Sequence, residues 1–192
     1  GEDGAGVAAV KTRHGIADMQ ERTEHRVVTT GCGQGSVFGG WMDEIDALKL
    51  PNATITQSRL YAVLNVIRVQ ESTYKSAGSV HGCALFDGEH MQLFVEDVGR
   101  HNAIDTIAGW MWMHSLQANQ DSIFYTTGRL TSEMVMKSAQ MGVAIAVSRS
   151  GITQMGFDIA QRLSLCTIGR ATNKHFLCYT QSERLVLDVG PS

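Results

Sequence analysis

A single cysteine, Cys32, lies in the glycine-rich stretch "TTGCGQGSVFGG" of residues 29–40. The stretch holds no second cysteine, so neither a local disulfide nor a local pair of zinc ligands explains it. Glycines on both sides permit tight turns and close backbone approach. A thiolate is nucleophilic where cations or backbone N–H groups stabilise it. The stretch therefore predicts an exposed thiol that carries a chemical group, or an ordinary free cysteine on a turn.

Four turns that follow predicted strands each combine an arginine with hydroxyl, amide or imidazole groups. The turns are "EDVGRHNAID", "TGRLTSEM", "SRSGIT" and "RATNKH", and their arginines are Arg100, Arg129, Arg149 and Arg170. Guanidinium groups, backbone N–H groups and helix N-termini all bind phosphate oxygens. The turns predict a site for a polyanion, most simply a nucleotide-like diphosphate. The alternative is structural: Asp97, Thr131 and Thr153 cap helices, and the arginines are solvated.

Strands and helices alternate along most of the chain, and their order must position these turns. The pattern predicts strands at 25–30, 80–86, 91–96, 122–127, 143–148, 165–169 and 175–180, and helices at 54–70, from about 100, at 131–141 and at 153–163. Unbroken apolar strands alternating with helices indicate an α/β sheet covered on both faces, and the final hairpin indicates a mixed sheet. Ligands bind such sheets at the carboxyl ends of the strands. We predict one α/β domain over residues 26–192, after a polar, mobile segment at 1–25.

Apolar spacing identifies the faces of the first two helices that the core should bury. Leu60, Val63, Leu64 and Ile67 form one stripe, and Ile104, Ile107, Ala108 and Met111 form the other. Cys83, Cys166 and Cys178 lie in apolar strand-like runs, which predicts that they are buried and unreactive. No pair of cysteines has C-x-x-C spacing, so we expect a reduced, cytoplasmic protein.

Composition excludes several classes of function. The chain of 192 residues is 43% hydrophobic and 18% charged, which is typical of a globular protein. A net charge of −3 argues against broad nucleic-acid binding, and no apolar run approaches the roughly 20 residues needed to cross a membrane. No histidine is followed two residues later by glutamate, and no zinc ligand set can be assembled, so a zinc deaminase is excluded and no metal site is expected.

The motifs "VEDVGRHNAID" and "TTGRLTSEMVMKSAQMGVAIAVSRS" closely resemble the FdhD family, the formate dehydrogenase accessory sulfurtransferases. The resemblance runs from the cysteine loop through "CYTQSERL". It implies a three-layer, cytidine-deaminase-like α/β fold without the zinc site, and a cytoplasmic homodimer. Family members carry a further N-terminal segment, so the resemblance also implies that a natural N-terminal segment is missing here.

The resemblance implies a role in sulfur transfer. Such a protein takes sulfur from a cysteine desulfurase and passes it to the bis-molybdopterin guanine dinucleotide form of the molybdenum cofactor, which then matures a formate dehydrogenase. Cys32 matches the cysteine that carries the sulfur as a persulfide. The "RATNKH" turn matches the cofactor-contacting stretch of the family, and the TGR turn matches its guanine nucleotide contacts. Residues at the other strand ends are expected to contribute the remaining cofactor contacts. The expected cofactor contacts are Arg170, Ala171, Thr172, Asn173, Lys174, His175, Arg129, Thr131, Ser148, Arg149 and His101.

The chain departs from the family at one position. Gly35 stands where the family usually has a second cysteine, so no internal disulfide can discharge a persulfide on Cys32 there. Either one cysteine suffices, which we favour, or the protein is a chaperone that holds the cofactor without sulfur chemistry. A third, weaker alternative is a nucleotide hydrolase with His101 and Glu96 as acid and base. The structural alternative for His101 is a histidine at a helix start that bonds a backbone group.

Overall fold

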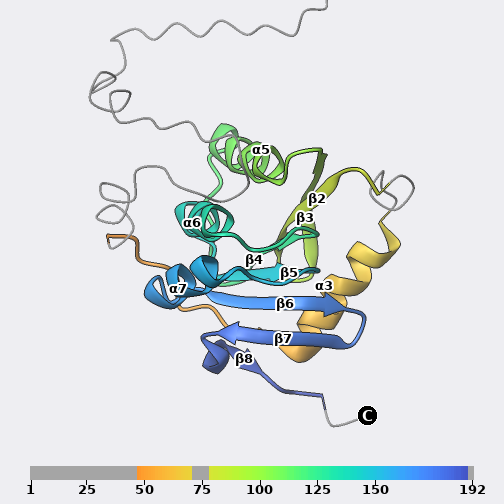
Figure 1. Ribbon diagram of the computed structural model, residues 1–192, viewed down its shortest axis with the longest axis vertical. Helices are drawn as coiled ribbons and strands as arrows, with labels where there is room; N and C mark the ends of the chain where they lie inside the picture. The colour runs from red at the N-terminus through yellow and green to blue at the C-terminus, as the bar shows by residue number, and fades with distance from the viewer. Residues whose placement is uncertain (1–46, 71–77, 190–192) are drawn as a thin grey trace, which may run out of the picture. The chain divides into compact units, whose positions relative to one another are not determined.

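The computed structural model describes residues 47–70 and 78–189 (Figure 1). The predicted strand at 25–30, the Cys32 loop and the predicted domain boundary at residue 25 all lie outside the described residues. They remain predictions from the sequence.

A six-stranded mixed sheet forms the centre of the described structure. Its strands are β2 (His81–Asp87), β3 (His90–Asp97), β4 (Ser122–Thr126), β5 (Ile145–Ser148), β6 (Cys166–Thr172) and β7 (His175–Thr180), in the order β3-β2-β4-β5-β6-β7. Strands β4, β5 and β6 pair in parallel, whereas β2 is antiparallel to β3 and β4, and β7 is antiparallel to β6. The predicted strands that fall within the described residues and the mixed sheet are confirmed.

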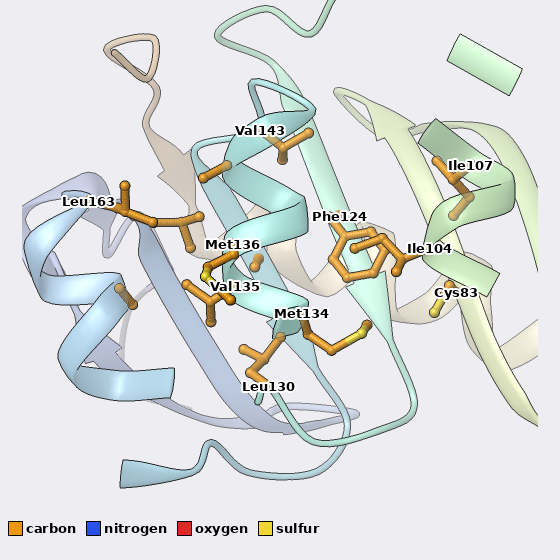
Figure 2. Close-up of a cluster of buried hydrophobic side chains, with 14 of the residues drawn as sticks. Cys83, Ile104, Ile107, Phe124, Leu130, Met134, Val135, Met136, Val143 and Leu163 are labelled. Atoms are coloured by element: carbon orange, nitrogen blue, oxygen red, sulfur yellow. The ribbon is translucent and has the colours of Figure 1, made fainter. Parts of the chain in front are cut away.

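Helices cover both faces of the sheet, which confirms the predicted three layers (Figure 1). Helix α3 (Gln57–Val69) packs on one face, and α5 (Arg100–Met113), α6 (Ser132–Gln140) and α7 (Gln154–Arg162) pack on the other. Alternate residues of β4 supply the two cores: Phe124 packs with α5 and α6, as Figure 2 shows, whereas Ile123 and Tyr125 pack with α3. None of the helices within the described ranges is both long and apolar enough to span a bilayer.

The predicted apolar stripes are buried, except that Ala103 rather than Ala108 is buried in α5. All four stripe residues of α3 are in the core. In α5 the buried set is Ala103, Ile104, Ile107 and Met111, and Ala108 is only half-buried. The prediction that all three strand cysteines are buried is wrong for Cys178, which is half-buried on the edge strand β7, whereas Cys83 and Cys166 are inaccessible.

A short second sheet, which the sequence did not indicate, attaches the C-terminal part of the chain to the start of α3. Strand β1 (Ile55–Thr56) pairs in parallel with β8 (Leu185–Val186), which follows the 3-10 helix η1 (Ser182–Arg184). The guanidinium of Arg184 donates to the carbonyls of Pro51 and Ala53 at 3.1 and 2.9 Å. Thr56 then caps α3 by accepting from the backbone N–H of Arg59.

Candidate functional site

The four arginine-bearing turns lie at one edge of the sheet. Strand β3 runs in the same direction as β4 because both are antiparallel to β2, and β4, β5 and β6 are mutually parallel. The carboxyl ends of all four strands therefore meet at the same edge. Arg100, Arg129, Arg149 and Arg170 follow or occupy these strand ends, as the sequence predicted.

Hydroxyl groups hold the ends of β4 and β5 in place. The completely buried Ser148 donates its hydroxyl to the Gly128 carbonyl at 2.7 Å and accepts from the Ser150 N–H at 3.0 Å. Ser150 in turn donates to the Thr127 carbonyl at 2.9 Å. Ser148, one of the expected cofactor contacts, thus uses its hydroxyl to position the turns that carry Arg129 and Arg149.

A groove of about 140 Å³ opens at this edge on the α3 face of the sheet. It has an apolar wall from α3 and the strands and a polar rim from the strand ends, with the lining residues Leu64, Ile67, Arg68, Phe94, Tyr125, Thr127, Arg149, Ala171, Thr172 and Asn173. Arg149, Ala171, Thr172 and Asn173 were expected from the sequence. Arg68 was not, because it lies in the last turn of a helix distant in sequence from the strand ends.

A second hollow borders the same β6–β7 turn. It is lined by Gln57, Tyr61, Arg170, Lys174, His175, Phe176 and Leu177. The turn therefore contributes Thr172 and Asn173 to the groove, and Arg170, Lys174 and His175 to this hollow. The basic side chains of "RATNKH" do not share one pocket with Arg149.

Helix α3 fixes the position of this turn. Tyr61 donates its hydroxyl to the Lys174 carbonyl at 3.2 Å and accepts from Gln57 Nε2 at 2.6 Å. Its ring meets the Phe176 ring edge-on, with 6.1 Å between centroids. Gln57 Oε1 is buried and has no partner among the described residues, so it is available to a donor on a ligand.

The turn itself has an irregular backbone. Arg170 and Asn173 have positive φ values of 49° and 50°, which is common for asparagine but unusual for arginine. The pairing register shifts between Gly169 and Thr172, and the Arg170 N–H donates to the Ser150 carbonyl instead of continuing the ladder. Such conformations cost roughly 1–3 kcal/mol each and are concentrated at binding sites.

On the α5 and α6 side of the edge, His101 pairs with Glu133. His101 Nε2 lies 3.0 Å from Glu133 Oε2, and Lys137 Nζ contacts Asp105 Oδ2 at 2.7 Å. Burial lowers the pKa of His101, although the Glu133 carboxylate opposes the shift. The hydrolase alternative placed His101 with Glu96, but the carboxylate that pairs with His101 is Glu133.

Arg100 packs tightly against the turn after β4. A Cβ added at Gly128 would lie 3.1 Å from Arg100 Cδ and 3.3 Å from His81 Nδ1, so this turn has no room for a side chain. Burial, followed by the positive charge of Arg100, lowers the pKa of His81. Arg100 Nε is buried without a partner among residues 47–70 and 78–189. His81 was not among the residues expected from the sequence, because it lies at the start of a strand rather than after the end of one.

The structural alternative for the helix starts is correct at one of three positions. Thr153 caps α7 by accepting from the Gly156 N–H. Asp97 accepts from the Gly99 N–H, but the N-cap of α5 is Gly99 itself, and no side chain caps this helix. Thr131 occupies the N-cap position of α6 but makes no capping bond, and its hydroxyl, on a residue 8% exposed, has no partner in the described structure. Arg129, beside it, is exposed.

Comparisons with known proteins identify the family of this chain. The family model described as "FdhD/NarQ family" matches residues 2–186. The sulfur carrier protein FdhD of Bacillus subtilis (strain 168) is 30% identical over 173 residues, covering 88% of this chain and 64% of the relative. The protein of the same name from Bacillus pumilus (strain SAFR-032) is 27% identical over 186 residues, covering 96% of this chain and 70% of the relative.

A solved structure is also similar. It is a crystal structure of a protein assigned as a formate dehydrogenase accessory protein from Desulfotalea psychrophila, with a TM-score of 0.67 and 28% identity. The match covers 74% of this chain and 62% of that one. This chain therefore spans only part of the length of its relatives. With a family model matched over nearly the whole chain, this protein belongs to the FdhD/NarQ family.

Proposed function

We propose that this protein is a sulfur carrier that serves the maturation of a formate dehydrogenase. Its relatives are named sulfur carrier proteins, and the similar solved structure is assigned as a formate dehydrogenase accessory protein. Cys32 takes sulfur from a cysteine desulfurase as a persulfide and passes it to the bis-molybdopterin guanine dinucleotide form of the molybdenum cofactor. In this proposal the protein is a cytoplasmic homodimer, and the transferase reaction needs only this one cysteine.

One observation carries the proposal for the acceptor. The β6–β7 turn presents polar and cationic groups into two hollows at once, one of them walled by α3 and Phe94. A large acceptor with anionic phosphates and flat ring systems needs both cationic groups and apolar walls. Buried atoms without partners at the same edge, Gln57 Oε1 and Thr131 Oγ1, are available to such a substrate.

The residues of the chain have distinct parts in this proposal. Arg129, Arg149 and Arg170 bind phosphate oxygens, while Asn173 and Thr172 orient the substrate at the groove. Ser148 acts indirectly, because it is buried and its hydroxyl positions the turns, whereas Ala171 forms part of the groove wall. His101, kept largely neutral by burial, accepts or donates hydrogen bonds rather than supplying a fixed charge.

Mass spectrometry tests the carrier. After incubation with a cysteine desulfurase and free cysteine, the peptide with Cys32 should gain the mass of one sulfur atom, and dithiothreitol should remove it. Cys32→Ser should abolish the gain and leave guanine nucleotide affinity nearly unchanged, since the substitution replaces one atom. Sulfur loading that persists in Cys32→Ser would contradict the assignment.

A second candidate is a cofactor-binding chaperone without sulfur transfer. Gly35, which removes the usual second cysteine, favours it. A wild-type protein that binds the cofactor tightly but never gains sulfur would establish this alternative. Gly35→Cys, which restores the two-cysteine spacing, distinguishes the candidates further, because the carrier proposal expects loading without it.

A further inference from the structure

Two cysteines other than the proposed carrier lie on neighbouring strands in one apolar cluster. Cys166 begins β6 and belongs to the cluster beneath α3, and Cys178 of β7 packs against the same cluster. An interaction between the two thiols raises the pKa of Cys166 and lowers the pKa of Cys178. We propose that Cys166 and Cys178 form a dithiol site that exchanges reversibly with small disulfides, closing a cross-strand disulfide between β6 and β7. This site does not include Cys32 and does not depend on the proposed function.

The strand register places both side chains on the α3 face of the sheet. Ile168 pairs with Cys178, and directly opposite residues share a face. Cys166 and Ile168 also share a face because side chains alternate along a strand. Cys166 accordingly belongs to the apolar cluster beneath α3, and Cys178 packs against it. An irregularity between Thr167 and Ile168 shifts the pairing, so that Cys166 lies diagonally across from Cys178.

The two thiols differ in a way that sets the order of reaction. Cys166 is inaccessible to solvent, and its hydrogen bond to Cys178, together with burial, raises its pKa far above the ordinary value. The same hydrogen bond lowers the pKa of Cys178, which is half-buried on an edge strand. Cys178 thus has the larger thiolate fraction and the better access, the two properties that identify an attacking thiol.

The exchange is balanced with a small disulfide, R–S–S–R, as the oxidant. The Cys178 thiolate attacks one sulfur, which forms a mixed disulfide and releases R–S⁻. The Cys166 sulfur, giving its proton to the released thiolate, then attacks the Cys178 sulfur and expels the second R–S⁻, which takes a proton from water. The two protein thiols lose two electrons, and the small disulfide is reduced to two thiols.

Cys83 is the internal comparison for this chemistry. It is inaccessible, its thiol donates to the Thr126 hydroxyl at 3.3 Å, and burial raises its pKa to about 12. It has no thiol neighbour among the described cysteines and should remain reduced under the same conditions.

The cross-link would close the hairpin that carries the β6–β7 turn. Residues 170–175, which line both hollows, lie between the two cysteines. A covalent link across this hairpin restricts the unfolded chain and stabilises the fold. The oxidised protein should unfold at a temperature higher by about 5 °C or more than the reduced one.

Tryptic mapping of the full chain tests the proposal, because each cysteine falls in its own peptide. Cleavage after arginine and lysine places Cys166 in residues 163–170 and Cys178 in residues 175–184. With excess glutathione disulfide, we expect these two peptides to be joined, at their summed mass less two hydrogen atoms, and to separate again with dithiothreitol. Two reduced peptides, or glutathione left on Cys178 without the link, would overturn the proposal.

Variants in a Cys32→Ser background identify the attacking thiol. Cys178→Ser should leave Cys166 unmodified, whereas Cys166→Ser should trap glutathione on Cys178. Because Cys166 is buried and its variant can misfold, a second probe uses the wild-type pair. Phenylarsine oxide, which bridges two close thiols, should bind the Cys32→Ser protein and lose binding in Cys32→Ser/Cys178→Ser. Equal binding to both proteins would contradict the pairing.

Discussion

The Tyr61 hydroxyl on α3 donates to the Lys174 carbonyl in the β6–β7 turn, across 113 positions of sequence. This bond links the first long helix of the described structure to the turn that lines both hollows. The same hydroxyl accepts from Gln57, so the helix presents an organised polar pair to the turn. The position of the turn at the sheet edge thus depends on α3 as well as on its own strands.

Tyr61→Phe removes this bond while it keeps the ring against Phe176. We expect a loss of about 1 kcal/mol or less in unfolding free energy, because the bond is solvent-exposed. Hydrogen exchange of the amides at 173–176 should become faster. Unchanged exchange there would show that the strands alone hold the turn. Tyr61→Ala, which also removes the aromatic contact, should cost more.

Arg149→Ala should weaken binding of GDP roughly tenfold or more, because a charge-assisted phosphate contact contributes about 1.5–3 kcal/mol. Arg129→Ala, on the adjacent turn, should have a similar effect if both turns contact the nucleotide. Calorimetry measures both affinities. Arg162→Ala is the matched control, since Arg162 ends α7 at the opposite edge of the sheet. If Arg149→Ala or Arg129→Ala binds GDP with wild-type affinity, the substituted arginine does not contact the nucleotide.

Gly169→Ala should destabilise the protein by roughly 1–3 kcal/mol through overpacking. The new Cβ would lie 2.5 Å from the Tyr179 ring and 3.0 Å from the Ser150 carbonyl oxygen. Gly109→Ala is the control with the same chemical change, because no atom lies within 4 Å of its Cβ position on α5. It should stabilise by about 0.5–1 kcal/mol. Urea unfolding measures both, and equal effects would contradict the packing argument.

Acidification should destabilise the fold through His81 and His101. Both have pKa values lowered mainly by burial from 6.5, so the folded state binds fewer protons than the unfolded state near that pH. Their stabilisation is complete above the unfolded pKa and is lost as the pH falls through the folded values. Urea unfolding between about pH 7.5 and about pH 5 should show the decline. Histidine NMR titrations would contradict it if both pKa values exceeded 6.5.

Glu133→Gln should change the pKa of His101 without changing that of His81, which distinguishes the contributions of the two histidines. It removes the carboxylate that raises the pKa of His101, so that pKa should fall further while the pKa of His81 changes little. A rise in the pKa of His101 would show that Glu133 does not face it in solution.

Local sequence determined the elements of this protein and the chemistry at the strand ends. The stripe of Leu60, Val63, Leu64 and Ile67 marks the buried face of α3, because helical periodicity is a property of neighbouring residues. Unbroken apolar strands marked the parallel part of the sheet. Their common direction was enough to place Arg129, Arg149 and Arg170 at one edge, whereas Arg100 joins them because β3 and β4 are both antiparallel to β2. Cys32 and its loop remain predictions from the sequence.

The tertiary structure alone decided how these groups are distributed. Arg149 and Arg170 line different hollows, and the sequence could not separate them because the shift in register at the turn depends on packing around Gly169. Tyr61 and Arg68 join the site from a helix whose contact with the turn is long-range. The same reason explains the Cys166–Cys178 pair, since two thiols twelve residues apart meet only when β6 and β7 pair in this register.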